Sequence, residues 1–359
     1  MTIKVSLSER VLHFRQPAGT SRGVYTERRS WFVTLTDGER VGVGECAPLP
    51  RLSQDDLPDY GARLRARCDE FADAVSEGDE AVDAFFDSMR DYPSMLFGME
   101  TALYSFRGGW REVGGERLPL LLDTPFSRGE QGIPINGLVW MGTFEEMSRR
   151  IEQKLSQGFR CVKLKIGAID FDAELSLLKQ IRRRFGPREV ELRVDANGAF
   201  TFDEALYKME LLSQYALHSI EQPIKAGQWS YMAELCRDAP LPVALDEELI
   251  GVSDPDQKRQ MLNIIRPAFI VLKPSLHGGM TGCREWVDIA RDMGVGSWVT
   301  SALESNVGLN AIAQLCADVY GGNISMPQGL GTGQLFTDNI PMPLEIRGSK
   351  LWTTLKIED

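Results

Sequence analysis

One stretch decides the fold: residues 161–197 read CVKLKIGAIDFDAELSLLKQIRRRFGPREVELRVDAN. It begins with a short apolar run, continues as an amphipathic helical pattern and ends in a second short run at residues 191–197. Two strands separated by one helix and short loops are the repeating unit of proteins with parallel sheets. The stretch therefore predicts a strand–helix–strand unit.

The same pattern recurs about every 27 residues from Ile133 onward, the length expected of one strand, one helix and two short loops. Eight such units predict a TIM barrel, the parallel (β/α)8 fold of the α/β class, rather than a doubly wound sheet. The eighth run is the weakest because Pro327 and several glycines interrupt it. The runs lie at residues 134–140, 161–167, 191–197, 217–224, 242–249, 269–275, 296–303 and 323–329.

The residues outside the barrel predict a second, α+β unit. We expect residues 1–132 to form a capping domain, residues 133–337 to form the barrel, and the extended tail at 338–359 to pack back on the cap. Two loops of the capping domain have the flexible composition of a lid over the barrel. The alternative is that they are ordinary connecting loops. The cap shows strand patterns at 3–14, 25–36 and 40–46, helical patterns at 55–90 and 94–110, and loops at 16–23 and 48–53.

Composition and charge exclude several classes of protein. The 359 residues include 40 Lys and Arg against 51 Asp and Glu, a net charge of −11 that argues against nucleic acid or an anionic membrane as the main partner. The chain has no apolar run long enough for a transmembrane helix, and no signal peptide is apparent at its start. Six scattered cysteines without CxxC spacing indicate reduced thiols in a cytoplasmic protein. The oligomeric state stays open.

Three carboxylates are expected at the ends of consecutive barrel strands. Asp195, Glu221 and Asp246 each end an apolar run, where barrel enzymes carry their chemistry. Converging acids repel one another unless a cation binds them, and an all-oxygen site selects a hard divalent ion. We therefore predict a site for Mg²⁺, with Mn²⁺ as a possible substitute. The alternative is that each acid caps a helix or pairs with a lysine.

Three lysines are expected beside these acids. Lys163 and Lys165 are two residues apart, so their side chains point to the same side of one strand, while Lys273 ends the sixth run on the far side of the cavity. A lysine near Mg²⁺ and a second ammonium group has a lowered pKa and can serve as a base. The set fits proton abstraction alpha to a carboxylate, with salt bridges to the acids as the alternative.

These residues resemble the enolase superfamily, in particular its muconate-lactonizing-enzyme-like subgroup, over the whole chain. Within that subgroup, residues 301–308 (SALESNVG) and 328–332 (QGLGT) are similar to the seventh-strand and eighth-strand segments of o-succinylbenzoate synthases. An Asp-x-Asp pair typical of dipeptide epimerases is missing from the eighth segment. The matching motifs are Lys163-Leu-Lys165, Asp195-Ala-Asn197, Glu221-Gln-Pro223, Asp246-Glu247 and Lys273-Pro274.

The resemblance implies a hydro-lyase of menaquinone biosynthesis that acts on a small dicarboxylate. It would dehydrate 2-succinyl-6-hydroxy-2,4-cyclohexadiene-1-carboxylate to o-succinylbenzoate by syn elimination. Lys165 would act as base and then acid, Lys273 would stay cationic over the ring, and Lys163 would keep the pKa of Lys165 low or contact the carboxylate. Substrate-binding roles would fall to Asn197, Arg193, Ser301, Glu304, Gly331 and Arg22.

Three other functions stay open at this point. An N-acylamino-acid racemase would use Lys165 and Lys273 as acid and base on opposite faces of its substrate. A class I aldolase would form a Schiff base on a lysine, which nearby carboxylates disfavour because they keep the amine protonated. A barrel kept only as a binding protein would have no use for the complete set of acids and lysines.

Overall fold

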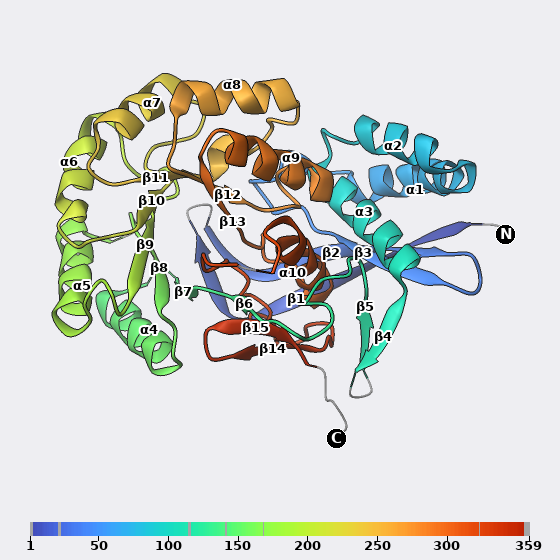
Figure 1. Ribbon diagram of the computed structural model, residues 1–359, viewed down its shortest axis with the longest axis horizontal. Helices are drawn as coiled ribbons and strands as arrows, with labels where there is room; N and C mark the ends of the chain where they lie inside the picture. The colour runs from blue at the N-terminus through green and yellow to red at the C-terminus, as the bar shows by residue number, and fades with distance from the viewer. Residues whose placement is uncertain are drawn as a thin grey trace.

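The computed structural model describes residues 3–20, 23–113, 116–140, 142–167, 169–322 and 324–354. Its centre is a curved sheet of seven parallel strands with helices along its outer side, and a smaller sheet with three helices lies beside it (Figure 1). The expected α/β barrel with an α+β cap is confirmed. No helix in these ranges is both long and apolar enough to cross a bilayer.

The small sheet forms from the N-terminal strands, which pair antiparallel in the order β1-β2-β3. The sequence prediction of a loop at residues 16–23 is wrong for 16–20 and Gly23, because β1 runs to Thr20 and β2 starts at Gly23, with the register shifting between His13 and Ala18. Residues 21 and 22 lie outside the described residues. The predicted helix at 55–90 is two helices that meet at Gly78. The elements are β1 (Lys4–Thr20), β2 (Gly23–Thr36), β3 (Val41–Cys46), α1 (Tyr60–Glu77), α2 (Asp79–Ser88), α3 (Pro93–Gly108), β4 (Trp110–Val113) and β5 (Glu116–Pro119).

Helix α3 lies directly on β3 because glycines remove the side chains between them. A Cβ atom on Gly44 would lie 1.9 Å from the carbonyl oxygen of Gly98, and one on Gly98 would lie 2.1 Å from Cys46 Sγ. Neither contact is possible, so both positions require glycine for this close approach. The packing holds the small sheet against the helix that reaches the barrel.

The parallel strands follow the predicted repeat, each shorter than its apolar run. Their order from β13 to β7 is the order of the sequence, as successive right-handed crossovers produce. The strands are β7 (Gly137–Val139), β8 (Cys161–Lys165), β9 (Glu191–Asp195), β10 (Ser219–Glu221), β11 (Val243–Leu245), β12 (Phe269–Leu272) and β13 (Gly296–Val299). The helices are α4 (Phe144–Ser156), α5 (Phe171–Arg184), α6 (Phe202–Ser213), α7 (Trp229–Asp238), α8 (Pro255–Ile265), α9 (Gly279–Asp292) and α10 (Asn306–Val319), with a 3-10 turn η1 (Glu247–Leu249).

In the described residues, the predicted eighth strand at 323–329 does not form a continuous ladder of hydrogen bonds. Two isolated β-bridges take its place. Gln328 pairs with Ile135 and Gly329 pairs with Thr300, both parallel. Gln328 N donates to Pro134 O at 2.8 Å and Gly329 N donates to Val299 O at 2.8 Å. Pro327 has no N–H to extend this ladder. The segment therefore closes the barrel between its first and last strands with only a few hydrogen bonds.

The C-terminal hairpin joins the start of the barrel. Strand β14 (Leu344–Arg347) pairs antiparallel with β15 (Lys350–Thr353), and β15 pairs antiparallel with β6 (Ile133–Pro134). Just before them, the chain contacts β1, where Thr337 N donates to His13 O at 2.8 Å. The domain division at 132 and 133 stays a prediction.

The six cysteines are free thiols, five of them buried. No disulfide joins them, and burial raises the pKa of Cys68 to about 11. Their role is in packing, as apolar side chains.

Glu100 links the cap to the barrel and makes stability depend on pH. It is fully buried on α3 and accepts from the backbone N–H groups of Met280 and Thr281 at the start of α9. Burial raises the pKa of Glu100 to about 7. The native state therefore binds more protons than the unfolded chain between the ordinary glutamate pKa and about 7, so stability present at low pH is lost as the pH rises through 7.

We expect Glu100→Gln to weaken this pH dependence by about 3 kcal/mol between pH ~4.5 and ~7.5. Urea unfolding of the variant and the wild type at both pH values measures the difference. The exposed Glu80 on α2 offers the control Glu80→Gln, which should follow the wild type. An identical pH dependence in Glu100→Gln would show that Glu100 stays ionised in the fold.

Candidate active site

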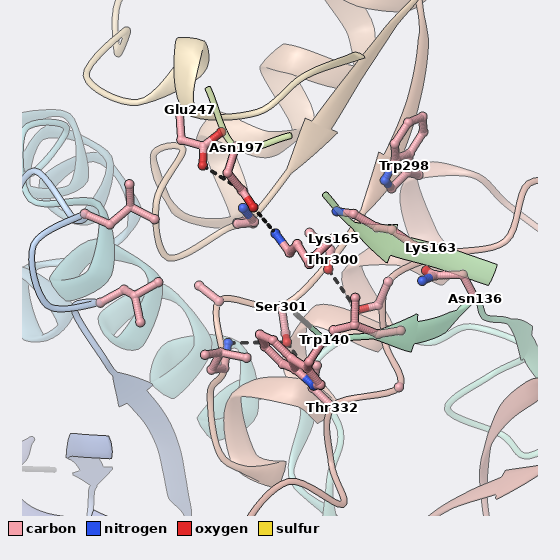
Figure 2. Close-up of a pocket in the computed structure, with 18 of the residues that line it drawn as sticks. Asn136, Trp140, Lys163, Lys165, Asn197, Glu247, Trp298, Thr300, Ser301 and Thr332 are labelled. Carbon is pink, nitrogen blue, oxygen red and sulfur yellow. Dashed lines mark hydrogen bonds between the residues drawn. The ribbon is translucent and has the colours of Figure 1, made fainter. Parts of the chain in front are cut away.

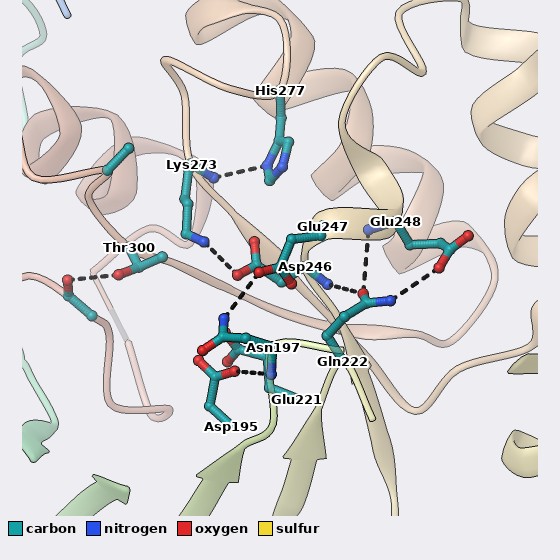
Figure 3. Close-up of polar contacts among 12 residues, drawn as sticks. Asp195, Asn197, Glu221, Gln222, Asp246, Glu247, Glu248, Lys273, His277 and Thr300 are labelled. Carbon is teal, nitrogen blue, oxygen red and sulfur yellow. Dashed lines mark hydrogen bonds and ion pairs between the residues drawn. The ribbon is translucent and has the colours of Figure 1, made fainter. Parts of the chain in front are cut away.

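The three predicted carboxylates lie together at the ends of their strands. The register pairs Lys165 with Asp195 and Asp195 with Glu221, so strands β8, β9 and β10 end side by side. Asp246 follows β11 directly, at the next position around the sheet. All three acids are buried, with at most 2% of the side chain exposed. Figure 3 shows them converging at the ends of the strands.

Lysine ammonium groups lie between these carboxylates. Lys163 Nζ lies 2.7 Å from Asp195 Oδ2 and 2.6 Å from Glu221 Oε1. Lys165 Nζ lies 2.6 Å from the same Asp195 oxygen, and Lys273 pairs with Asp246. The structure thus brings the predicted acids and lysines into one cluster, in which they pair as salt bridges. Their roles as metal ligands and catalytic groups stay predictions.

The cluster shifts the pKa values of its members strongly. Burial favours the neutral amine of Lys163, but Asp195, Glu221 and Asp246 outweigh it and raise the pKa above its ordinary value. The pKa of Lys273 is raised in the same way, against burial, mainly by Asp246. Burial, followed by Asp195, raises the pKa of Glu221 well above the usual range. The lowered pKa expected for a lysine of this site is therefore not found for Lys163 or Lys273, because the carboxylates beside them favour the ammonium form.

The donor set fits a hard divalent cation. Glu221 Oε2 and Asp246 Oδ1 are buried and accept no hydrogen bond from the described residues, so each has an oxygen available for a ligand. Within the described ranges, no group of three acids, histidines or cysteines has the geometry of a metal site. At the three carboxylates, Lys163 Nζ lies between Asp195 and Glu221. Three carboxylates without a sulfur or imidazole ligand suit Mg²⁺ or Mn²⁺.

Asn197 connects the cluster to Glu247, a residue that the sequence reasoning did not assign. Asn197 Oδ1 accepts from Lys165 Nζ at 2.7 Å, and Asn197 Nδ2 donates to Glu247 Oε1 at 2.9 Å. The φ angle of Asn197 is +46°, a left-handed conformation that asparagine tolerates well. Glu247 lines the pocket, and its place beside Asp246 in the Asp-Glu pair was the signal that could have identified it.

A pocket open to solvent lies over this cluster. Lys163, Lys165 and Lys273 all line it, and Figure 2 shows the amine of Lys165 pointing toward Asn197, to which it donates a hydrogen bond. Loops of the cap form part of the wall. Apart from Arg22, the sequence predicts no cap residue that would contact the substrate. The apolar wall consists of Tyr25, Leu49, Leu52, Leu138, Trp140, Trp298, Ala302 and Leu303, and the polar wall includes Asn136, Thr300, Ser301 and Thr332.

The chain matches two family models, the enolase C-terminal domain-like family over residues 146–351 and the MenC N-terminal domain over residues 20–106. It is 45% identical to the o-succinylbenzoate synthase of Desulfotalea psychrophila, over 95% of this chain and 96% of the relative. The chain belongs to the o-succinylbenzoate synthase family of the enolase superfamily.

Solved structures agree with this family. The crystal structure of MenC from Desulfotalea psychrophila matches 98% of this chain and all of its own with a TM-score of 0.82 and 39% identity. A dipeptide epimerase of Enterococcus faecalis, solved with Mg and a dipeptide, has a TM-score of 0.80 and 18% identity, over 98% of this chain and 96% of its own. The second match shows that a protein described as a dipeptide epimerase shares this fold.

Only some of the predicted substrate-binding residues of this family member reach the pocket. Asn197, Ser301 and Gly331 line it, and Ser301 Oγ lies 2.6 Å from Thr332 Oγ1. Arg193 lies below Trp298, with its guanidinium 4.5 Å from the ring centre and its Nε donating to Glu191.

Glu304 also lies outside the pocket wall. It accepts from Ala302 N at 2.7 Å and from Ser275 Oγ, and thereby shapes the loop that carries Ser301. Arg22 falls outside the described residues. The roles of all six residues in binding substrate stay predictions.

Asn197→Asp is expected to lower kcat by about 10- to 100-fold with little change in KM. The substitution keeps the size and the left-handed backbone, but it replaces the donor to Glu247 by a second carboxylate, and repulsion displaces the group that orients Lys165. Steady-state kinetics measure this effect. Asn263→Asp, at an exposed position on α8, is the control. A kcat within twofold of the wild type would mean that Lys165 needs no orientation by Asn197.

Proposed function

We propose that this chain catalyses the dehydration of 2-succinyl-6-hydroxy-2,4-cyclohexadiene-1-carboxylate to o-succinylbenzoate in menaquinone biosynthesis. The observation that carries the proposal is the group of three lysines and three carboxylates at the base of one pocket, in a chain 45% identical to an o-succinylbenzoate synthase. A small dicarboxylate as the partner and the cytoplasm as the place of action are part of this proposal.

Lys165 is the proposed acid–base residue. It removes the proton alpha to the ring carboxylate, and the C–H electron pair enters the ring system. Lys165 then returns that proton to the hydroxyl on the same face, the C–O bond breaks, and water leaves an aromatic ring. Its position at the pocket wall, 2.7 Å from Asn197 Oδ1, supports this role because a single oriented amine can serve both steps.

Lys163 and Lys273 provide positive charge near Lys165 in this proposal. Both line the pocket, and the neighbouring carboxylates raise the pKa of both amines. Fixed cations stabilise negative charge that develops on the substrate after proton removal. Asp195, Glu221 and Asp246 would hold Mg²⁺, or Mn²⁺, and a bound ion would add positive charge beside the substrate carboxylate and lower the pKa of neighbouring ammonium groups.

Incubation with the cyclohexadiene substrate tests the function directly. We expect ultraviolet absorbance of an aromatic product to rise in the presence of Mg²⁺ and to stay flat after treatment with EDTA. Absence of aromatic product at any Mg²⁺ or Mn²⁺ concentration would contradict the proposal.

N-acylamino-acid racemization is the second candidate, because Lys165 and Lys273 line the same pocket. Two amines that contact opposite faces of a substrate can exchange the alpha proton with inversion. Incorporation of deuterium into N-succinyl amino acids in D₂O, without aromatic product from the cyclohexadiene, would favour this activity over dehydration.

A further inference from the structure

Arg28 is a fully buried arginine that joins two walls of the pocket. It lies on β2, with 1% of its surface exposed, and its guanidinium donates to four backbone carbonyl groups. Nη2 donates to Ala47 O at 2.6 Å and to Ala302 O at 3.3 Å, Nε donates to Leu303 O at 3.3 Å, and Nη1 donates to Pro48 O. One side chain of the cap therefore binds backbone of the cap and of the barrel.

Both bound segments reach the pocket. Ala47 and Pro48 immediately precede Leu49, which lines the pocket, and Ala302 and Leu303 line it themselves. Leu303 has a φ angle of +66°, a left-handed conformation that costs energy for a leucine. The hydrogen bond from Arg28 to its carbonyl group is one of the contacts that hold this strained residue in place.

Two buried acids, Glu45 on β3 and Glu304 within the loop, also fix this loop. Glu45 on β3 accepts from Ser305 N at 2.9 Å and from Gly308 N at 2.9 Å, at the start of α10. Glu304 accepts from Ser275 Oγ, in the segment that follows Lys273. Glu304 and Glu45 oppose the effect of burial, which lowers the pKa of Arg28. The acids Glu45 and Glu304 thus favour the positive charge of the buried Arg28.

We infer that Arg28 is a positioning residue that sets the Ala302–Leu303 wall against the part of the substrate remote from the reacting carbon. The inference rests on the proposed function. Figure 2 shows Ser301 and Thr332 on a different side of the pocket from Asn197 and Glu247, so this wall lies away from the groups that hold Lys165. Contacts with a remote part of a substrate that are equally strong in the ground state and the transition state affect KM and leave kcat nearly unchanged.

Arg28→Lys tests this role because lysine keeps the charge but lacks the planar fork that reaches four carbonyl groups. We expect KM for the cyclohexadiene to rise at least tenfold, with kcat within about threefold of the wild type. The affinity for o-succinylbenzoate, followed by the fluorescence of the pocket tryptophans, should fall at least tenfold, while the affinity for benzoate stays within twofold. Arg29→Lys is the matched control, since Arg29 is the next residue on β2, is exposed and pairs with Glu9.

Hydrogen–deuterium exchange supplies a readout that does not depend on activity. We expect Arg28→Lys to speed exchange in residues 46–49 and 302–305 together, and Arg29→Lys to leave both segments unchanged. A lower kcat at unchanged KM, equal losses for both ligands, or unchanged exchange would overturn the inference.

If Arg28→Lys does not fold, Glu45→Gln, which loosens the same loop at α10, must raise KM instead. A wild type without dehydration activity would contradict the proposed function, while the exchange experiment would still decide whether Arg28 couples the two loops.

Discussion

Lys165→Ala is expected to abolish dehydration while leaving Mg²⁺ binding intact. Lys165 Nζ lies at the pocket wall, 2.6 Å from Asp195 and 2.7 Å from Asn197, and in the proposed reaction it carries the proton from carbon to the leaving hydroxyl. Loss of a group that serves as both base and acid should lower kcat by about 10⁴-fold or more. The carboxylate ligands stay in place, so titration calorimetry with Mg²⁺ should give nearly the wild-type affinity.

Lys179→Ala provides the control for this variant. Lys179 is exposed on α5, so its loss should change neither kcat nor metal affinity. Near-wild-type turnover in Lys165→Ala would refute the assignment of the base. In that case Lys273, on the other side of the cluster beside Asp246, would become the candidate, and Lys273→Ala would decide.

Asp195→Ala should lose both metal binding and activity. Asp195 is buried between Lys163 and Lys165 and also accepts from Asn197 N at 3.0 Å, so it organises the base as well as the proposed metal site. We expect Mg²⁺ binding to fall below detection and kcat/KM to fall at least about 10³-fold. Calorimetry and the ultraviolet assay measure the two effects.

Removing one partner of a buried ion pair can also destabilise the fold by about 3–5 kcal/mol. Asp195→Asn, which keeps the size and a hydrogen-bond acceptor, separates that effect from loss of the site, and circular dichroism checks the fold of both variants. Asp203→Ala, at an exposed position on α6, is the control for a lost acid. Metal affinity retained in both Asp195 variants would show that Asp195 is no ligand.

The parts of the site that depend on strand periodicity could be predicted. Lys163 and Lys165 are on one side of β8 because side chains alternate along a strand. Asp195 and Glu221 meet because parallel strands of a barrel end at the same face. Both arguments need only the local pattern and the repeat, which the sequence contains.

The parts that depend on loops and on the cap could not be predicted. Of the loop expected at 16–23, residues 16–20 and Gly23 are strand, because pairing between β1 and β2 supplies hydrogen bonds that composition does not reveal. Tyr25 and Leu49 line the pocket only because the small sheet lies against the barrel mouth. Glu304 belongs to a motif that the sequence reasoning assigned to substrate, yet it binds Ser275 and Ala302, since a buried carboxylate needs donors nearby.

The sequence by itself determined the barrel, the order of its strands and the acids and lysines at their ends, because these follow from periods of 2 and 3.6 residues and from the rules for parallel sheets. Only the tertiary structure decided which lysine pairs with which acid, how Gln328 and Gly329 close the barrel, and how the cap completes the pocket. The contact between Arg28 and Leu303 spans 275 residues of sequence. Such a contact depends on how two surfaces far apart in the sequence pack together, and no local pattern encodes it.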